Sequence, residues 1–316
     1  MSRIYALAQR FSRISVVAAI VLFILFKSIG LEVSLSFQLG IALCALALGI
    51  PHGAIDHLVA LPSTPRRRVV LYVALYVLIA IMAGIAIATW NIWGFRAVIV
   101  MSALHFGFGD AAYFNEFRDA QSRPRHSTLS EIIYALPAGL VPLLLPLTDS
   151  QATKALLRIN PNLSDWAGTD VTIFRNGTIG LAILSILLLL VTSHREQSLD
   201  LAMLLLLSLI ATPLITFAIY FGCWHAIRHT ARLVPKLPRA RANIEREDIW
   251  GAIRAAVLPG LYALVGTLLL AAILMTTNSN HFGSSLLWST LVIVWALTVP
   301  HMMTTSKFDI SALWSR

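Results

Sequence analysis

The sequence is short of charged residues, and this shortage excludes an ordinary soluble domain. Charged residues make up 12% of the 316 positions and hydrophobic residues 58%, whereas a soluble domain carries roughly 25% charged and roughly 45–50% apolar residues. The apolar residues gather in runs long enough to cross a bilayer, which takes about 20 residues of helix. We therefore expect an integral membrane protein.

Cysteine is equally scarce. The chain has 2 cysteines, Cys44 and Cys223, and both lie within apolar runs, so they make neither a disulfide framework nor a thiolate metal site. The net charge of +9 does not indicate nucleic-acid binding, because the basic residues lie in short loops between apolar runs, as the positive-inside rule requires of a membrane protein. No nucleic-acid partner is expected.

The apolar runs that are candidate membrane helices cover residues 14–30, 34–57, 69–90, 93–114, 130–148, 174–193, 199–226, 252–276 and 285–303. The basic N-terminus and the basic loops at 58–68 and 118–125 fall on one side if successive runs cross the membrane. The most basic loop, 228–246, joins them only if one of the three runs between 130 and 226 does not cross. The run 130–148 contains three prolines, which favour kinks and re-entrant segments, so we expect this run not to cross.

These considerations predict an all-α integral membrane protein, a polytopic helical bundle of about eight transmembrane helices within a range of seven to nine. Residues 1–316 are expected to form a single membrane domain in the cell (inner) membrane, with both termini in the cytoplasm. The polar stretches 149–173 and 228–250 are too short to fold alone, and the sequence does not indicate the role of the first.

Ionisable side chains inside the apolar runs are the strongest functional signal. At a helix centre, Asp, Lys or Arg costs at least roughly 2.5–3.5 kcal/mol, so such residues mark functional sites by default. They gather here in residues 49–57, 105–110, 223–229 and 300–301. In the eight-helix arrangement the histidines of these segments fall at a similar depth, which a shared site requires.

The spacing of these residues suits a metal. His225 and His229 are four residues apart and share one helical face, so both can reach one ion. His52 and Asp56 have the same spacing, and a carboxylate orients a metal-bound imidazole by accepting its other ring proton. Asp110 follows His105 by five residues and is expected to act likewise where the nearby glycines bend the helix.

The candidate residues form three groups. The expected metal ligands are His52, His105, His225 and His229. Candidates for a supporting role or an extra ligand are Asp56, His57, Asp110 and His301, of which His57 also suits the headgroup region and His301 a hydrogen bond between helices. Candidates for substrate contact, with core packing as the alternative, are Phe106, Phe108, Phe221 and Trp224.

The residue types around the histidines limit the chemistry. An all-imidazole site suits zinc, copper, iron or nickel. The His-Glu-x-x-His motif of zinc hydrolases is missing, and the helices offer no evident Glu, Ser or Cys nucleophile. Such a site favours redox chemistry on oxygen carried by the metal itself. Because the site lies among membrane helices, its substrate is expected to be apolar.

Three segments resemble a known family. Pro-His-Gly-Ala-Ile-Asp-His at 51–57, His-Phe-Gly-Phe-Gly-Asp at 105–110 and Trp-His-Ala-Ile-Arg-His at 224–229 resemble the Brp/Blh family of membrane-bound β-carotene 15,15′-dioxygenases, which make retinal for rhodopsins. The similarity spans about residues 40–305, whereas 150–173 matches no feature of it.

The resemblance implies a specific reaction. The four histidines would hold a non-haem Fe(II) that directs O₂ onto the central double bond of β-carotene, giving two molecules of all-trans-retinal. It also implies an apolar slot open to membrane lipid that centres the polyene on the iron, and a functional link to a retinal-binding rhodopsin.

Two other functions remain open from the residues. A di-iron lipid hydroxylase or desaturase also uses membrane histidines, but it needs about eight of them and a His-x-x-His-His box, which is missing. A transporter coupled to protons or metal ions would use His and Asp without consuming oxygen. A retinal-binding photoreceptor is disfavoured because no helix carries a central lysine for a Schiff base.

Overall fold

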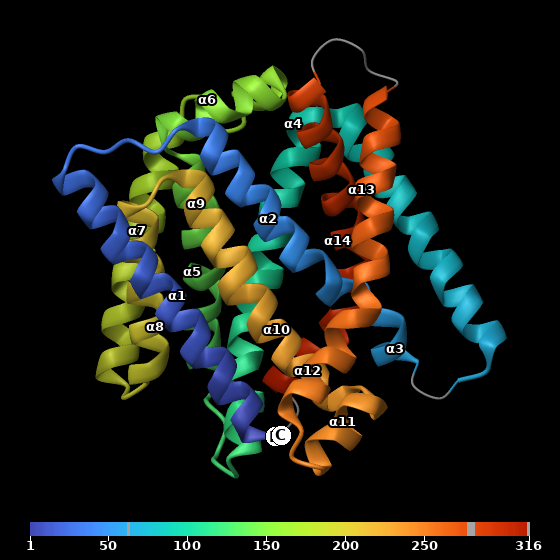
Figure 1. The fold of residues 1–316 in the computed structure, drawn as a ribbon. Helices are drawn as coiled ribbons and strands as arrows, with labels where there is room; N and C mark the ends of the chain where they lie inside the picture. The colour runs from blue at the N-terminus through green and yellow to red at the C-terminus, as the bar shows by residue number, and fades with distance from the viewer. Residues whose placement is uncertain (62–63, 277–281, 315–316) are drawn as a thin grey trace.

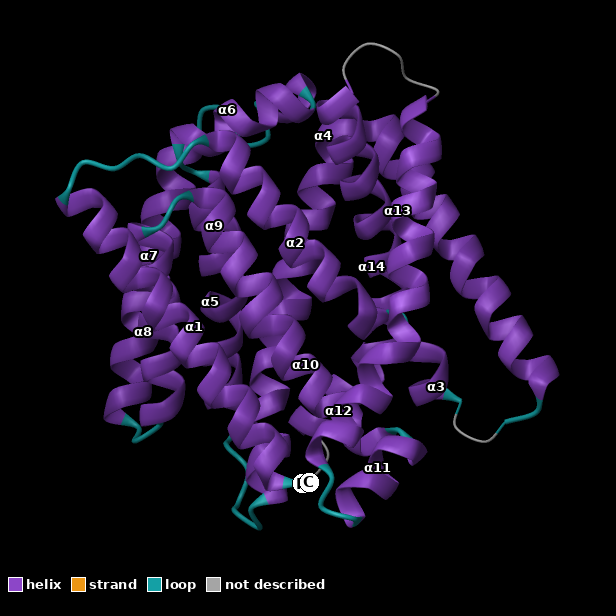
Figure 2. Cartoon of the chain, viewed as in Figure 1, coloured by secondary structure: helices purple, strands orange, loops and turns teal. Residues whose placement is uncertain are grey.

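The computed structural model describes residues 1–61, 64–276 and 282–314, and within these ranges every regular element is a helix (Figures 1 and 2). Six helical stretches of the described chain are long and apolar enough to cross a membrane. The predicted all-α polytopic fold is therefore confirmed. The helices in chain order are α1 (Ser2–Ser28), α2 (Leu35–Gly53), α3 (Asp56–Ala60), α4 (Arg66–Ala120), α5 (Thr128–Leu147), α6 (Ser150–Ile159), η1 (Pro161–Leu163), α7 (Val171–Val191), α8 (Arg195–Ile210), α9 (Pro213–Ala218), η2 (Ile219–His225), α10 (Ala226–Leu233), η3 (Val234–Lys236), α11 (Pro238–Glu245), α12 (Ile249–Val257), η4 (Leu258–Gly260), α13 (Leu261–Thr276) and α14 (Phe282–Trp314).

Helix α4 is a hairpin of two arms rather than one straight helix. Its 55 residues would reach about 83 Å if straight, far beyond the roughly 30 Å of a bilayer core. The chain reverses at Asn91, whose φ of 31° lies in a region that Asn tolerates better than most residues. At Gly94 an added Cβ would lie 2.8 Å from Ile87 Cα, so the two arms meet closely because this residue has no side chain.

The structure corrects the expectation for residues 130–148. Helix α5 is continuous through its three prolines and is one of the stretches long enough to cross. Prolines are tolerated in such helices because neighbouring helices and local adjustments satisfy the freed backbone groups.

The predicted run 199–226 is in fact two helical stretches, because α8 ends at Ile210 and α9 begins at Pro213. Four helical stretches, α5, α7, α8 and α9–α10, therefore lie between the basic loops 118–125 and 228–246, where two crossings were expected. Among these four, α5 and α7 are long and apolar enough to cross by themselves. The even number keeps both loops at one end of the bundle, where Figure 1 also shows α11 and α12.

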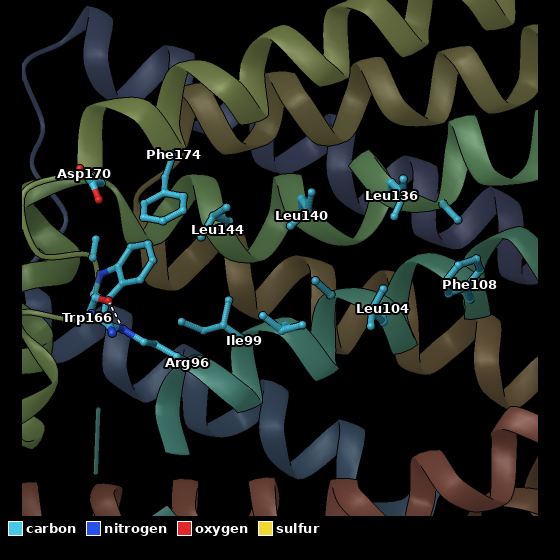
Figure 3. A pocket seen from close by; sticks show the side chains of 14 residues that line it. Arg96, Ile99, Leu104, Phe108, Leu136, Leu140, Leu144, Trp166, Asp170 and Phe174 are labelled. Atoms are coloured by element: carbon cyan, nitrogen blue, oxygen red, sulfur yellow. Dashed lines mark hydrogen bonds between the residues drawn. The ribbon is translucent and has the colours of Figure 1, made fainter. Parts of the chain in front are cut away.

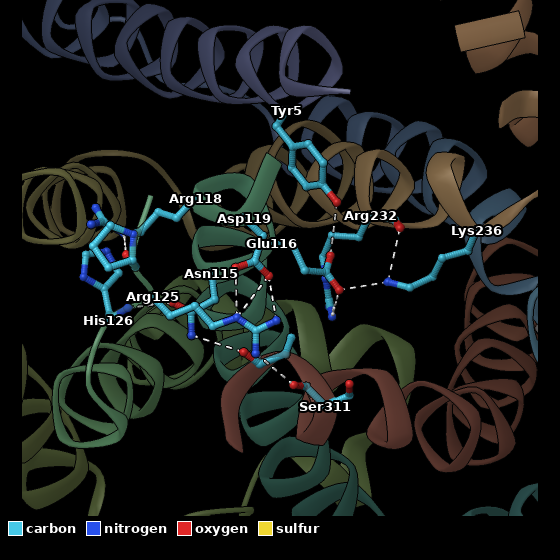
Figure 4. Close-up of polar contacts among 12 residues, drawn as sticks. Tyr5, Asn115, Glu116, Arg118, Asp119, Arg125, His126, Arg232, Lys236 and Ser311 are labelled. Carbon is cyan, nitrogen blue, oxygen red and sulfur yellow. Dashed lines mark hydrogen bonds and ion pairs between the residues drawn. The ribbon is translucent and has the colours of Figure 1, made fainter. Parts of the chain in front are cut away.

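Buried ion pairs hold the helices together at this basic end (Figure 4). Arg232 on α10 pairs with Glu116 on α4 at 3.0 Å and with Asp309 on α14 at 2.7 Å, and its side chain is only 2% exposed. Lys236 adds a second cation at 2.8 Å from Glu116. Removing one member of a buried pair leaves the other as an unpaired buried charge, which commonly lowers the stability by about 3–5 kcal/mol. These pairs therefore fix how α4, α10 and α14 pack against one another.

Helices α4 and α5 approach each other at two facing glycines. A Cβ on Gly107 would overlap the carbonyl of Ala135 on α5, and a Cβ on Gly139 would overlap the carbonyl of Ala103 on α4. Small residues allow such close contact between membrane helices. This contact sets the position of the α4 segment that carries His105.

Candidate metal centre

Five buried histidines from five different elements converge on one region. Their rings contact one another with centroid separations from 5.0 Å (His105 to His301) to 5.9 Å (His105 to His229). No ring is more than 8% exposed. The sequence predicted four of them as ligands and His301 as a supporting residue or extra ligand, and the structure brings all five together. They are His52 on α2, His105 on α4, His225 in η2, His229 on α10 and His301 on α14.

Two local breaks in helix geometry shape the cluster. Helix α2 ends at Gly53, just after Pro51 and His52, and α3 begins at Asp56. The stretch η2 is a π-helix that ends at His225, and π-turns inside α-helices occur frequently at functional sites. His225 and His229 nevertheless lie on one face as predicted, with ring centroids 5.7 Å apart and planes inclined by 23°.

Asp56 orients His301 and not His52. Its Oδ2 lies 2.8 Å from His301 Nδ1 and accepts a hydrogen bond from the Tyr76 hydroxyl at 3.1 Å. The expectation that Asp56 shares a helical face with His52 is wrong, because the helix breaks between them. A carboxylate held this way fixes the ring and its tautomer, so His301 Nε2 is the nitrogen left to face the other rings.

The imidazole nitrogens of this cluster are largely without partners. Within the described ranges, six buried nitrogens of four of these histidines accept or donate no hydrogen bond: His105 Nε2, His225 Nδ1 and Nε2, His229 Nδ1 and Nε2, and His301 Nε2. A buried polar atom left unsatisfied costs about 1–3 kcal/mol, and native proteins keep few of them. Their concentration at one place fits a group that binds through nitrogen lone pairs, as a transition metal does.

The ring spacing fits the same group. Imidazoles bound through nitrogens about 2.1 Å from an ion have ring centres about 5 Å apart in a tetrahedral arrangement, close to the observed 5.0–5.9 Å. Among the described side chains, no three donor atoms are already gathered into a coordination sphere. Binding would therefore require the rings to turn about χ2, a torsion whose energy well is broad for histidine.

The predicted partner role of Asp110 is not what the geometry shows. Its Oδ2 accepts hydrogen bonds from Trp224 Nε1 at 2.8 Å and from the Tyr220 hydroxyl at 3.4 Å, instead of from His105. The Trp224 ring in turn lies 3.6 Å from the Arg228 guanidinium carbon. Asp110 and Trp224 thus form a buried polar pair, and the substrate contact expected for Trp224 stays a prediction.

Two cavities meet at a pair of phenylalanines beside the histidines. A cavity of about 240 Å³ is lined by His52, His105 and His301, with His57 also in its wall. A second cavity of about 160 Å³ is almost wholly apolar. Phe106 and Phe221 line both cavities, and the Phe106 ring lies 4.4 Å from that of His225. These two predicted substrate residues therefore lie between the two cavities, beside the histidines, and their contact with a substrate stays a prediction.

A third cavity, larger than these two, lies away from the histidines. It holds about 510 Å³ between α4, α5 and α7 and contains Phe108, the third predicted phenylalanine, but no histidine (Figure 3). Arg96 at one end donates to the Trp166 carbonyl at 2.6 Å. Its lining offers no cluster of buried donors, so size alone does not make it the reactive site.

Tyr76 and Arg232 belong to the site, although the sequence reasoning missed both. Tyr76 donates to Asp56, and Arg232 Nη1 donates to the Gly109 carbonyl at 3.3 Å, next to the ring of His225. Arg232 follows His225 by seven residues, two helical turns, and this spacing was the available signal. Nothing local in the sequence paired Tyr76 with Asp56.

Comparison with known proteins identifies the family of this chain. Residues 43–309 match the family described as Beta-carotene 15,15'-dioxygenase. The chain is 27% identical over 288 residues to the probable beta-carotene 15,15'-dioxygenase Blh of Halobacterium salinarum, covering 84% of this chain and 82% of that protein. It is 29% identical over 273 residues to the beta-carotene 15,15'-dioxygenase of uncultured marine bacterium 66A03, covering 82% and 91%. No solved structure matches. The chain therefore belongs to the beta-carotene 15,15'-dioxygenase family.

Proposed function

We propose that this protein cleaves β-carotene at its central 15,15′ double bond with O₂, giving two molecules of all-trans-retinal. One carbon–carbon double bond breaks, and each of its carbons receives one oxygen atom, so one O₂ balances two aldehydes. The observation that carries the proposal is the cluster of buried imidazoles with unpartnered nitrogens, beside two apolar cavities, in a chain of this family.

We propose Fe(II) as the cofactor. Iron would supply the one-electron chemistry that O₂ requires. Its ligands would be His52, His105, His225 and His229, each neutral and binding through a ring lone pair. His301 would be a fifth imidazole, because Asp56 holds its Nδ1 and leaves Nε2 directed at the other rings.

The chain's own part in catalysis is to position the substrate. Neighbouring double bonds of a long polyene are chemically alike, so the bond held at the correct place reacts. Phe106 and Phe221 would flank the polyene where it passes the histidines. Val73 and Val77, on the outer arm of α4, line the histidine cavity while remaining 41% and 47% exposed. In a bilayer this side faces lipid, so β-carotene would enter there.

We propose a cell-membrane location with both termini in the cytoplasm. The support is the gathering of the basic loops at one end of the bundle (Figure 1), because cytoplasmic loops are rich in Lys and Arg. The retinal released would then be available to a retinal-binding rhodopsin in the same membrane.

The test is expression in bacteria that accumulate β-carotene, with carotene and retinal quantified by chromatography. Retinal should appear as carotene falls, at about two molecules per carotene lost, and His225→Ala should prevent this. Unchanged carotene with folded, iron-loaded protein would refute the proposal. Two irons per chain would favour the di-iron hydroxylase instead, and metal-dependent flux without oxygen uptake would favour a transporter.

A further inference from the structure

The segment between α5 and α7 closes one end of the apolar cavity. Its helices α6 and η1 lie across an end of the bundle (Figure 1). Five of its residues line the cavity: Ala152, Ala155, Leu156, Ile159 and Leu163. Phe106 and Phe221, beside the histidines, line the same cavity. Phe106 lies about three helical turns along α4 from Phe95, which shares a hydrophobic cluster with Leu156. The cavity is therefore a slot with the histidine cluster at one end and this segment at the other.

The closing segment is held firmly in place. Asn160 Nδ2 donates to Asn91 Oδ1 at 3.0 Å, at the reversal of α4, and Arg96 donates to the Trp166 carbonyl at 2.6 Å. Leu156 and Leu163 pack into a hydrophobic cluster with α4 and are 8% and 0% exposed. An end wall fixed by two hydrogen bonds and a packed cluster resists displacement by an apolar ligand.

The residues that line the slot span about the length of half a carotenoid. Phe95 and Phe106 on α4 both line it, and they are about 16 Å apart along the helix axis at 1.5 Å per residue. That length suits the ring and half-chain of a C40 polyene but not the whole molecule. A symmetric substrate pushed against a fixed wall would then present its central bond at the histidines.

We propose that this slot is the binding site for one half of the polyene and that Leu156 and Leu163 form the wall that selects the bond to be cleaved. This rests on the proposed function. The reaction is unchanged, since one double bond still takes one O₂ and yields two aldehydes. The wall decides only which bond lies at the metal.

The test compares two tryptophan variants on adjacent residues. Leu156→Trp shortens the slot, so the polyene should stop early and the products should shift from retinal alone to pairs of unequal apocarotenals. Its β-carotene affinity, measured by absorbance titration of the purified protein, should fall roughly tenfold. Leu157→Trp is the matched control, because Leu157 is 48% exposed and does not line the slot; it should yield retinal alone.

The outcomes separate this inference from the proposed function. If the unmodified chain makes no retinal, the proposed function fails. If it makes retinal and Leu156→Trp does so too, with unchanged product pattern and affinity, the wall is refuted. Should Leu156→Trp fail to fold by circular dichroism, Ala155→Leu shortens the slot less, and it must shift the products in the same direction or the inference is overturned.

Discussion

Replacing Asp56 by Asn tests the support of the proposed metal centre with the least change in shape. The Asp56 carboxylate is 3% exposed and lies 2.8 Å from Nδ1 of His301, which is 6% exposed. Asn keeps an oxygen that accepts the same hydrogen bond, so the substitution removes the negative charge and leaves the geometry. Hydrogen bonds to charged groups contribute about 1.5–3 kcal/mol and neutral ones about 0.5–1.5.

The difference between those two values, about 1–1.5 kcal/mol, predicts a roughly tenfold loss of iron affinity. Loss of a residue that orients a metal ligand typically costs 10–100-fold, so tenfold is the lower end of the range. The assay is iron per chain in purified protein equilibrated anaerobically over a series of free Fe(II) concentrations. Circular dichroism checks that helix content is retained.

Tyr76→Phe is the matched control, because it removes the 3.1 Å hydrogen bond to Asp56 and leaves the carboxylate in place. Its iron affinity should fall less than that of Asp56→Asn. Equal iron affinity in Asp56→Asn and the unmodified protein would show that the charge of the carboxylate does not support iron binding.

Three further predictions follow from other parts of the fold. His225→Ala and His229→Ala should each abolish iron binding and retinal formation while membrane insertion stays normal; full activity in either variant would refute the site. Gly139→Val should disrupt the α4–α5 contact, since even a Cβ there overlaps the Ala103 carbonyl, and lower the melting temperature in detergent far more than Gly177→Val, where a Cβ meets open space. Burial, together with the nearby Arg118 and His194, lowers the pKa of the loop residue His126 to about 4. Because this pKa is about 6.5 in an unfolded chain, the unfolded state binds more protons below that pH, so stability should fall between pH 6.5 and 4 and fall less in His126→Gln; an identical pH profile would contradict this.

The sequence by itself determined the class of protein and most of the site. Apolar runs of membrane length predicted the all-α fold because hydrocarbon forces backbone groups to bond internally. The histidines stood out because polar side chains in such runs are costly, and His225 and His229 share a face because helical spacing is fixed within one element. Charge alone predicts an even number of crossings between the two basic loops; both loops lie at one end of the bundle, and the number of crossings stays a prediction.

Tertiary structure decided everything that depends on contacts between distant segments. Because the helix breaks at 54–55 and α14 packs nearby, Asp56 forms a hydrogen bond with His301, whereas the sequence spacing had favoured His52. Asp110 met Trp224, 114 residues away, because α4 packs against η2. The three prolines that predicted a break lie inside a continuous α5. Neighbouring helices satisfy the backbone groups that the prolines leave without a hydrogen bond. Local chemistry names the residues that a site needs, but only the packing of helices decides which of them meet.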